Sequence, residues 1–255
     1  MKRGEGACLV CGQPLQYFRE AREMECSVCH GKFKSYASCK QGHYVCDACH
    51  EKKGLEAVMR ECGESGSKDP IHIIQTVMQD PYLYMHGPEH HVLVGTALLT
   101  AYHNAGGELD LAAALREMEA RGSGYPGGAC GLWGCCGAAV STGIFVSIVT
   151  GATPLSGKPW SLANQMTARA LDAVAQLGGP RCCKRNSFTA AQEAVLFTQE
   201  NLGVSMKLPE KIVCGFSQKN GECLKAYCPY YDRKSATSEK RDHKCREIHR
   251  IKKGG

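Results

Sequence analysis

Apolar residues recur at helical spacing over residues 69–206, the middle of the chain. Asp69 followed by Pro70 is typical of a helix start, and Pro88 repeats this signal further along. Ser161 and Ser187 stand where caps of the last two helices are expected. No stretch in this region alternates between apolar and polar residues as a half-buried strand does. The pattern predicts a compact all-α unit of about six helices, over residues 71–80, 88–105, 109–122, 132–150, 162–179 and 188–203.

The helix expected over 132–150 lies in a stretch without charged residues, from Gly122 to Gly157. Small residues follow one face at a spacing of four, at Cys135, Ala139, Gly143, Ser147 and Gly151. Such a stripe lets another helix approach closely, in a membrane or in a soluble core. Because Gly, Ser and Thr are frequent and Leu is rare, the stretch favours a buried central helix over a membrane span.

The two ends of the chain differ from this middle. Residues 1–53 are dense in Cys, His and charge and poor in aliphatics, so this module is expected to need metal to fold. Residues 54–68 are predicted to be a Gly- and charge-rich linker, and residues 207–255 a cysteine-rich segment with a basic tail. The expected fold is therefore mainly α: a helical bundle core over 69–206, an N-terminal two-zinc ribbon or knuckle module, and an irregular cysteine-rich C-terminal segment.

Composition and charge narrow the function classes. The chain has 255 residues, a net charge of +6 and seventeen cysteines, and it begins without an apolar run of signal-peptide length. A cytoplasmic protein is expected, in which thiols are metal ligands or reactive groups more often than disulfides. From Arg233 onward Lys and Arg exceed Asp and Glu, so the tail carries the excess charge. Such a tail could contact nucleic acid, but a solvated end is favoured.

The strongest motif is in the N-terminal module. Two Cys-x2-Cys turns, and a further Cys-x3-His-x2-Cys-x2-Cys run, supply thiolates at the spacing of closed tetrahedral sites. Two zinc ions are predicted, with the ligands Cys8, Cys11, Cys26, Cys29, Cys39, His43, Cys46 and Cys49. The sequence leaves open whether these pairs are used in order or cross-braced. A rubredoxin-like iron site and redox-active dithiols are the competing interpretations.

Three features of the helical core are expected to lie at helix N-termini, where unpaired amides and the helix dipole stabilise anions. They are two cysteine-containing turns and one His pair, namely Cys130, Cys135 and Cys136, then Cys182 and Cys183, then Glu89, His90 and His91. Lys184 and Arg185 stand beside the second turn. The thiols are interpreted as ligands of a metal or iron–sulfur cluster, with thiol chemistry or plain packing as alternatives. The His pair is as readily a structural polar group as an acid–base or ligand pair.

The C-terminal segment contains further cysteines that could complete a site, Cys214, Cys223, Cys228 and Cys245. Pro229 after the third of them is similar to ferredoxin loops. These thiols either form a centre of their own or fold back onto the core set. Cys62, isolated in the expected linker, is not predicted to be a ligand.

The motifs "GPEHHVLV", "GGACGLWGCCGAAVSTGIFVSIVTGATPL", "GGPRCCKRNS" and the late "CP" resemble an uncharacterised cysteine-rich family, domain of unknown function 5714. The resemblance covers most of the chain, including the N-terminal knuckles. It implies an origin in anaerobic bacteria or archaea and a link to methyltransferases, but it implies no activity. No Gly-rich strand–turn–helix motif for S-adenosylmethionine is present, so a methyltransferase activity is not expected.

A weaker, local resemblance of about fifty residues is to iron–sulfur-dependent serine dehydratases and cysteine desulfidases. The shared features are a Gly-Cys segment opening a small-residue helix and a later cysteine before "RN". The resemblance implies that Cys135 or Cys136, with Cys182 or Cys183, holds a [4Fe–4S] cluster. In that class three cysteines leave one iron open as a Lewis acid. The doubled cysteines, the cysteine-rich ends and the shorter chain depart from the family pattern.

Three functions are compared. The first is a cytoplasmic [4Fe–4S] protein with structural zinc, performing lyase- or sulfur-transfer-type chemistry on a small or sulfur-containing substrate. Here His90 or His91, with Glu89, and Lys184 or Arg185 would position that substrate. The second is a non-enzymatic electron carrier or metal-delivery protein with a redox or methyltransferase-type partner. The third is a zinc-ribbon adaptor that binds nucleic acid or a partner enzyme.

Overall fold

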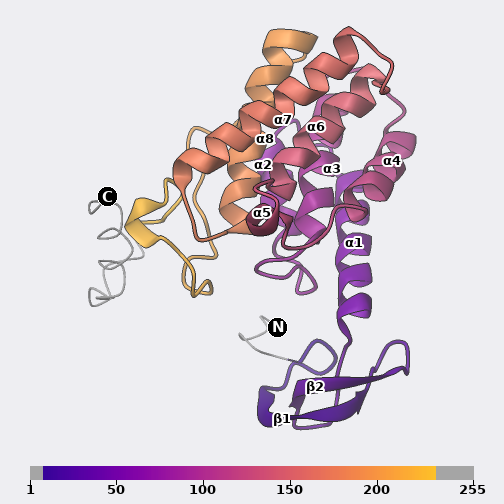
Figure 1. The fold of residues 1–255 in the computed structure, drawn as a ribbon, viewed down its shortest axis with the longest axis vertical. Helices are drawn as coiled ribbons and strands as arrows, with labels where there is room; N and C mark the ends of the chain where they lie inside the picture. The colour runs from indigo at the N-terminus through magenta and orange to yellow at the C-terminus, as the bar shows by residue number, and fades with distance from the viewer. Residues whose placement is uncertain (1–7, 234–255) are drawn as a thin grey trace.

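The computed structural model describes residues 8–233 of the chain. In that range the protein is mainly helical, with one two-stranded hairpin near the N-terminus, the helices α1–α8, and an irregular segment after them (Figure 1). This confirms the predicted fold class, a helical core flanked by a cysteine-rich N-terminal module and a cysteine-rich C-terminal segment.

The hairpin pairs β1 (Leu15–Glu25) with β2 (Lys32–Cys39) in antiparallel register. Leu15 lies opposite Cys39 and Glu25 opposite Lys32, with an irregularity between Tyr17 and Arg22. No residue of β1 is buried. A two-stranded hairpin without a hydrophobic face is at best marginally stable in water, so this module depends on contacts other than apolar packing.

Helix α1 (Asp47–Glu64) joins the hairpin to the bundle (Figure 1). Residues 54–68 are predicted above to be a linker, but α1 extends through most of that stretch. This stretch is helical because α1 has a narrow apolar stripe that packs on the bundle. Ala57, Val58 and Cys62 are buried against the core, while Gly63 and Glu64, which suggested a linker, are exposed.

Helix α3 (Glu89–Asn104) is the centre of the bundle and is buried along nearly its whole length. It packs against α1, α2 (Pro70–Val77), α4 (Leu111–Ser123), α6 (Gly137–Thr150) and α8 (Cys183–Leu202). Helix α7 (Lys158–Leu177) covers α6 and α8 (Figure 1). The predicted start at Asp69 is confirmed, since its Oδ1 accepts hydrogen bonds from the amides of Ile71 and His72.

The helix expected over 132–150 is divided into α5 (Ala129–Leu132) and α6. Gly134, at φ 65°, turns the chain between them, and Cys136 is the N-cap residue of α6. The small-residue stripe lets another helix approach α6 closely, as expected, because Gly143 lies against Ala163 and Thr167 of α7. Among residues 8–233 no helix combines the length and apolar character of a membrane span.

Two helices begin earlier than the serine caps suggest. Helix α7 begins at Lys158, where Pro159 in the first turn starts the helix ahead of Ser161. Helix α8 begins at Cys183, and the thiol of Cys182 accepts the hydrogen bond that a capping side chain normally accepts. Ser187 lies inside α8, and its hydroxyl donates to the carbonyl of Cys183 at 2.7 Å.

We expect Gly143→Ala to lower the free energy of unfolding by about 1–3 kcal/mol, because the added methyl would lie 3.0 Å from the carbonyl oxygen of Ala163. The matched control is Gly63→Ala, an exposed helical glycine with open space around it, which should raise stability by about 0.5–1 kcal/mol. Urea unfolding of both variants tests the packing. Equal changes in the free energy of unfolding for Gly143→Ala and Gly63→Ala would contradict the close approach of α6 and α7.

Candidate metal centres and polar core site

The eight ligand candidates of the N-terminal module form two groups of four, and within each group all ligand atoms lie within 4.8 Å of one another. The first group is Cys8, Cys11, Cys39 and His43, and the second is Cys26, Cys29, Cys46 and Cys49. Each Cys-x2-Cys turn therefore pairs with ligands from beyond the hairpin. The arrangement is cross-braced, which resolves the alternative that the sequence leaves open.

The hairpin register explains this pairing. Leu15 lies opposite Cys39, so the chain before β1 and the chain after β2 meet at one end of the hairpin. The turn that carries Cys26 and Cys29 is at the other end, and residues 44–49 return to it. Ser27 donates its amide to the carbonyl of Tyr44 at 2.7 Å. Cys46 and Cys49 open helix α1, so the second group also anchors that helix.

Distances within the two groups suit tetrahedral coordination. The sulfur atoms of Cys11 and Cys39 are 3.8 Å apart, as are those of Cys29 and Cys46. Metal–sulfur bonds of about 2.3 Å in a tetrahedron place two sulfurs about 3.8 Å apart. These residues therefore fit a tetrahedral metal ion.

The electrostatics of the second group also favour a bound cation. Burial raises the pKa of the Cys26 thiol, but amides donated by Cys46, Cys29 and Val28 outweigh burial and lower that pKa to about 6. The hydrogen bond to Cys46 instead raises the pKa of Cys49 to about 12. One thiol thus ionises readily while its neighbour resists, because adjacent thiolates repel. A bound cation removes that repulsion.

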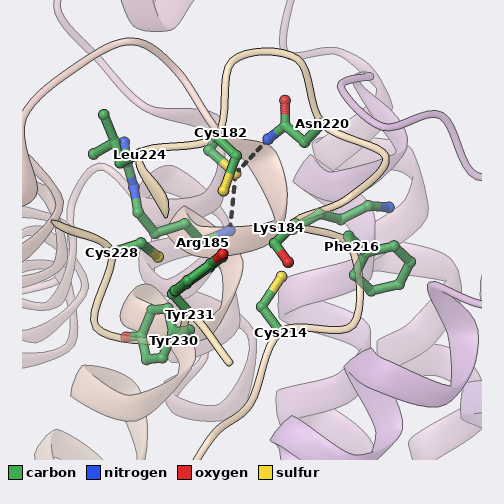
Figure 2. Close-up of a pocket in the computed structure, with 12 residues that line it drawn as sticks. Cys182, Lys184, Arg185, Cys214, Phe216, Asn220, Leu224, Cys228, Tyr230 and Tyr231 are labelled. Atoms are coloured by element: carbon green, nitrogen blue, oxygen red, sulfur yellow. Dashed lines mark hydrogen bonds between the residues drawn. The ribbon is translucent and has the colours of Figure 1, made fainter. Parts of the chain in front are cut away.

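Four further cysteines line one cavity between the start of α8 and the irregular C-terminal segment. We call them the C-terminal cysteine set: Cys182, Cys214, Cys223 and Cys228. The cavity has an empty volume of about 390 Å³ that includes some open solvent. In Figure 2 the sulfur atoms of Cys182, Cys214 and Cys228 face a common space. The pairing of Cys214 with Tyr231 folds the two ends of the segment together there.

Hydrogen-bond donors and cations surround these sulfurs. The Cys182 thiol accepts from the amide of Arg185 at 3.5 Å and from Asn220 Nδ2 at 3.4 Å. The Cys223 thiol accepts from the amide of Lys225 at 3.3 Å. Lys184 and Arg185 line the same cavity, and Lys184 is 1% exposed. The donors favour negative charge on Cys182 and Cys223, whereas burial raises the pKa of Cys214 to about 11 and also raises that of Cys228.

The remaining described cysteines of the core gather nearby. We call them the core cysteine set: Cys130, Cys135, Cys136 and Cys183. Cys136 accepts a hydrogen bond from Asn186 Nδ2 at 3.4 Å, and Asn186 lies one helical turn after Cys183. Burial, followed by the charges of Cys136, Cys182 and Cys130, raises the pKa of Cys183 to about 11. The two cysteine turns of the core are therefore neighbours in space.

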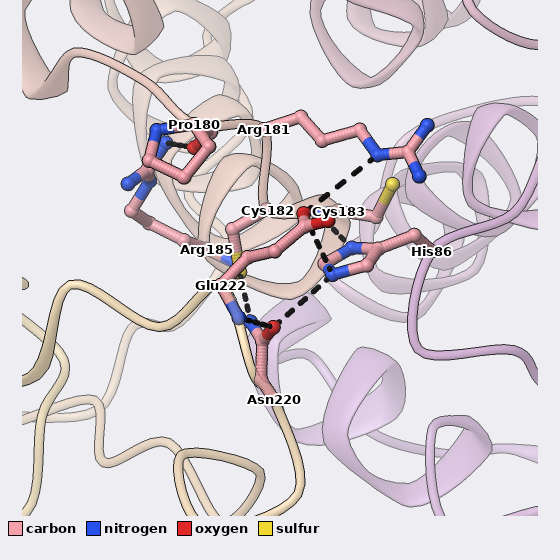
Figure 3. Close-up of polar contacts among 8 residues, drawn as sticks. All are labelled: His86, Pro180, Arg181, Cys182, Cys183, Arg185, Asn220 and Glu222. Carbon is pink, nitrogen blue, oxygen red and sulfur yellow. Dashed lines mark hydrogen bonds and ion pairs between the residues drawn. The ribbon is translucent and has the colours of Figure 1, made fainter. Parts of the chain in front are cut away.

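The adjacent thiols of Cys182 and Cys183 point in opposite directions (Figure 3). Cys182 contributes to the C-terminal cavity, whereas Cys183 lies near Cys136 and Cys130. Each cysteine within residues 8–233 is a free thiol, so the pair forms no vicinal disulfide.

Glu89 and His90 are buried polar groups with unused hydrogen-bonding atoms. Glu89 is 0% exposed and His90 1% exposed, and among the described residues 8–233 neither carboxylate oxygen of Glu89 nor Nε2 of His90 has a hydrogen-bond partner. Burial raises the pKa of Glu89 to about 7. Nδ1 of His90 lies 3.0 Å from the carbonyl of Gly87, and burial lowers the His90 pKa. His90 is therefore a neutral imidazole with its free nitrogen at Nε2.

Lys184 and His91 complete the polar surroundings. Lys184 Nζ donates to the carbonyl of Tyr84 at 3.0 Å, and burial lowers its pKa to about 8. The ring of His91 lies against Gly137, the residue after Cys136, and its Nδ1 is 3.1 Å from the carbonyl of Tyr125. Of the predicted acid–base candidates, His91 and Lys184 thus lie beside the cysteines, Glu89 lies against Gly54 of α1, and most donors of Arg185 bind backbone and Asn186 oxygens.

His86 is a site residue that the sequence analysis missed. Its Nδ1 accepts the amide of Cys183 at 3.4 Å, and its Nε2 lies 3.2 Å from Asn220 Oδ1 and 3.6 Å from Glu222 (Figure 3). Glu222 also faces Arg181 at 3.9 Å. His86 therefore joins the start of α8 to the C-terminal segment. Its proximity to "GPEHH" was the available signal.

Cys62 and Cys245 belong to neither of these two cysteine sets. Cys62 is buried and donates its thiol to Thr96 Oγ1 at 3.4 Å, away from both cysteine sets, in line with the prediction that it is not a ligand. Cys245 and most of the basic tail lie outside the described residues.

A family model described as a family of unknown function, DUF5714, matches residues 58–231. The match covers the bundle and the C-terminal cysteine segment but begins after the hairpin and its two ligand groups. The expected resemblance through the N-terminal knuckles therefore lies outside the matched residues. No curated protein and no solved structure matches the chain.

The cross-braced arrangement predicts which of the two metal ions a cysteine variant of the N-terminal module loses. Cys39→Ser should remove one of two bound N-terminal ions, because it breaks the group of Cys8 and Cys11 and leaves the other group intact. Cys29→Ser should remove the other ion. Metal analysis of a Cys39→Ser/Cys8→Ser double variant distinguishes the topologies. Loss of about one ion supports cross-bracing, and loss of both supports sequential pairing.

Glu89→Gln should change how stability depends on pH. The folded-state pKa of Glu89 is raised to about 7, so its contribution to stability is present below its ordinary pKa of 4.5 and is lost as pH rises through 7. The variant should therefore gain roughly 1–3 kcal/mol over the wild type between pH 5.5 and pH 8. Urea unfolding at both pH values measures the difference. A pH-independent difference would show that Glu89 is ionised in the folded protein.

Proposed function

The chain belongs to the family of unknown function DUF5714, and we propose that it is an iron–sulfur protein with two structural zinc ions. Its proposed activity is lyase- or sulfur-transfer-type chemistry on a small, sulfur-containing or hydroxy-acid substrate. The observation that carries the proposal is the cavity lined by Cys182, Cys214, Cys223 and Cys228 beside Lys184 and Arg185.

Zinc is the proposed metal for the two N-terminal groups. Three or four thiolates with at most one imidazole, in tetrahedral arrangement, match structural zinc sites. Each group supplies four protein ligands, so neither leaves a coordination position for a substrate. The module therefore has a structural or docking role, consistent with a hairpin that buries little apolar surface.

The C-terminal cysteine set suits a larger inorganic centre. A single tetrahedral ion needs sulfurs about 3.8 Å apart. Within residues 8–233, ligand atoms come within 4.8 Å as a group of three or more only in the two N-terminal groups. Four cysteines around one cavity, with amide donors and two cations, are the environment expected for a [4Fe–4S] cluster.

When bound, a cluster held by only three of these cysteines supplies a Lewis-acidic iron, and one held by all four supplies a one-electron relay. The chain itself supplies proton-carrying groups close to neutral pH. Burial lowers the pKa of Lys184 to about 8 and raises that of Glu89 to about 7, so each can hold or release a proton in this range. Neutral His90 offers an acceptor at Nε2, and Lys184 remains a donor to anionic groups.

Electron transfer is the second candidate function. Four cysteine ligands would close the coordination of a cluster in the C-terminal cavity, and a closed cluster relays electrons without binding substrate. A redox partner protein would then replace the small substrate. The proposed cytoplasmic location and the free thiols of residues 8–233 are compatible with either candidate.

Anaerobic purification with iron, acid-labile sulfide and zinc assays tests the proposal. Cys214→Ser and Cys228→Ser should lower iron and sulfide content and leave about two zinc ions per chain. Cys62→Ser, a buried cysteine outside both sets, is the matched control and should keep the metal content unchanged. Wild-type protein without iron, or unchanged iron in Cys214→Ser, would refute the cluster.

Spectra of the iron-loaded protein separate the two candidate functions. Small mercapto- or hydroxy-acids should perturb the spectrum if they bind at an iron site. An unperturbed spectrum together with reversible one-electron reduction would identify an electron carrier.

A further inference from the structure

Residues 80–88 join α2 to α3 without forming a helix or a strand, and they contact both helix α1 and the start of α8. We call them the connector. We infer that the connector couples metal binding in the second N-terminal group to the geometry of the C-terminal cavity. The N-terminal module would then regulate the proposed cluster site. The inference rests on the proposed function, in which zinc occupies that group and a cluster occupies that cavity.

Helix α1 begins inside the second N-terminal group. Cys46 is its N-cap residue, and Cys49 lies in its first turn. A segment held by metal ligands orders when the ion binds, so the first turn of α1 depends on the occupancy of this group. The first group lies at the opposite end of the hairpin and includes no residue of α1. Only the second group is therefore built into the helix that enters the bundle.

Tyr84 of the connector packs on this first turn of α1. Its ring stacks on the imidazole of His50, with the ring centroids 3.5 Å apart and the planes 10° apart. Its hydroxyl donates to Oδ1 of Asp47 at 3.3 Å. Asp47 and His50 directly follow Cys46 and Cys49, two ligands of the second group. The position of the Tyr84 ring therefore depends on the turn that the metal orders.

The connector stays close to α1 beyond this turn. A Cβ added to Gly54 would lie 2.9 Å from the carbonyl oxygen of Tyr82, so this glycine permits a close approach. Nη2 of Arg60 lies 3.6 Å from Oδ2 of Asp80, whose Oδ1 accepts the amide of Tyr82 at 2.9 Å. Because α1 and the connector touch at three heights, a displacement of the start of α1 is passed to the connector.

The backbone of Tyr84 faces the C-terminal cavity. Its carbonyl accepts a hydrogen bond from Lys184 Nζ at 3.0 Å. Lys184 lines the cavity, and its Nζ lies 4.9 Å from the ring centroid of Phe216, another lining residue (Figure 2). Tyr84 thus contacts the start of α1 with its side chain and holds the buried lysine of the cavity with its backbone.

His86 is the second contact of the connector with the cavity. Its Nδ1 accepts the amide of Cys183 at 3.4 Å, and its Nε2 lies 3.2 Å from Oδ1 of Asn220 (Figure 3). Asn220 in turn donates its Nδ2 to the sulfur of Cys182 at 3.4 Å. The connector therefore positions one proposed cluster ligand as well as Lys184.

Coupling follows from these contacts. Without metal, ionised thiols of the second group repel one another, and the first turn of α1 loses its anchor. Tyr84 then loses the contacts that fix its ring, and Lys184 and His86 are held less tightly. Because coupling between two sites is reciprocal, filling the cavity should also strengthen metal binding in the second group.

Hydrogen exchange of full-length variants tests the inference and does not require iron. Cys29→Ser should remove the ion of the second group and speed amide exchange at the start of α8 roughly tenfold. Cys11→Ser is the matched control, because it removes the ion of the first group and should leave that exchange at the wild-type rate. Equal exchange rates in the two variants, each with one zinc ion lost, would overturn the inference.

Tyr84→Leu tests the route through the connector and leaves every proposed metal ligand in place. It should speed exchange at the start of α8, and a chelator should remove one of its two zinc ions about tenfold faster than from the wild type. This variant decides if Cys29→Ser does not fold. Wild-type exchange at α8, or wild-type release of both ions, would overturn the inference. Combining Tyr84→Leu with Cys29→Ser should add little, because both break the same contact.

Iron release separates this inference from the proposed function. Cys29→Ser should release iron to a chelator about tenfold faster than Cys11→Ser. Equal release from the two variants would overturn the coupling and leave the proposed cluster intact. Wild-type protein without iron would refute the cluster, while a difference in exchange at the start of α8 would still support the coupling.

Discussion

The whole arrangement depends on bringing thiols close together, a state that proteins avoid unless a cation balances the charge. In the second N-terminal group, donated backbone amides lower the pKa of Cys26 to about 6, whereas the hydrogen bond to Cys46 raises the pKa of Cys49 to about 12. A metal ion attracts thiolates that would otherwise repel one another. Because the ligands come together only in the folded protein, the free energy of metal binding stabilises the fold. Under the zinc proposal, the hairpin, in which no residue of β1 is buried, would obtain its stability in this way, and the second group would transmit it to helix α1.

The same constraint shapes the junction between the bundle and the C-terminal segment. Helix α8 begins with two thiols that point to opposite sides, and His86 and Asn220 connect that helix start to the segment carrying Cys214, Cys223 and Cys228. Buried Lys184 lies between the two cysteine sets and is held by the carbonyl of Tyr84. Its burial is costly, and the hydrogen bond to that carbonyl offsets part of the cost.

Sequence pattern predicted the helical core and the N-terminal ligands because both depend on local spacing. The cap at Asp69 and the close-packing glycine at position 143 are likewise local signals. Pairing of the ligands was not predictable, since it depends on a hairpin register that sets Leu15 opposite Cys39. The linker expectation failed because the stripe of Ala57, Val58 and Cys62 is narrow. The opposite orientations of Cys182 and Cys183 depend on tertiary contacts, as does the role of His86.

Anomalous diffraction from anaerobically grown crystals, recorded at the iron and zinc absorption edges, tests the central claim most directly. The account predicts two zinc peaks in the N-terminal module and iron density between Cys182, Cys214, Cys223 and Cys228. A cavity without iron, or with zinc alone, would contradict the account and leave the core cysteines as packing groups.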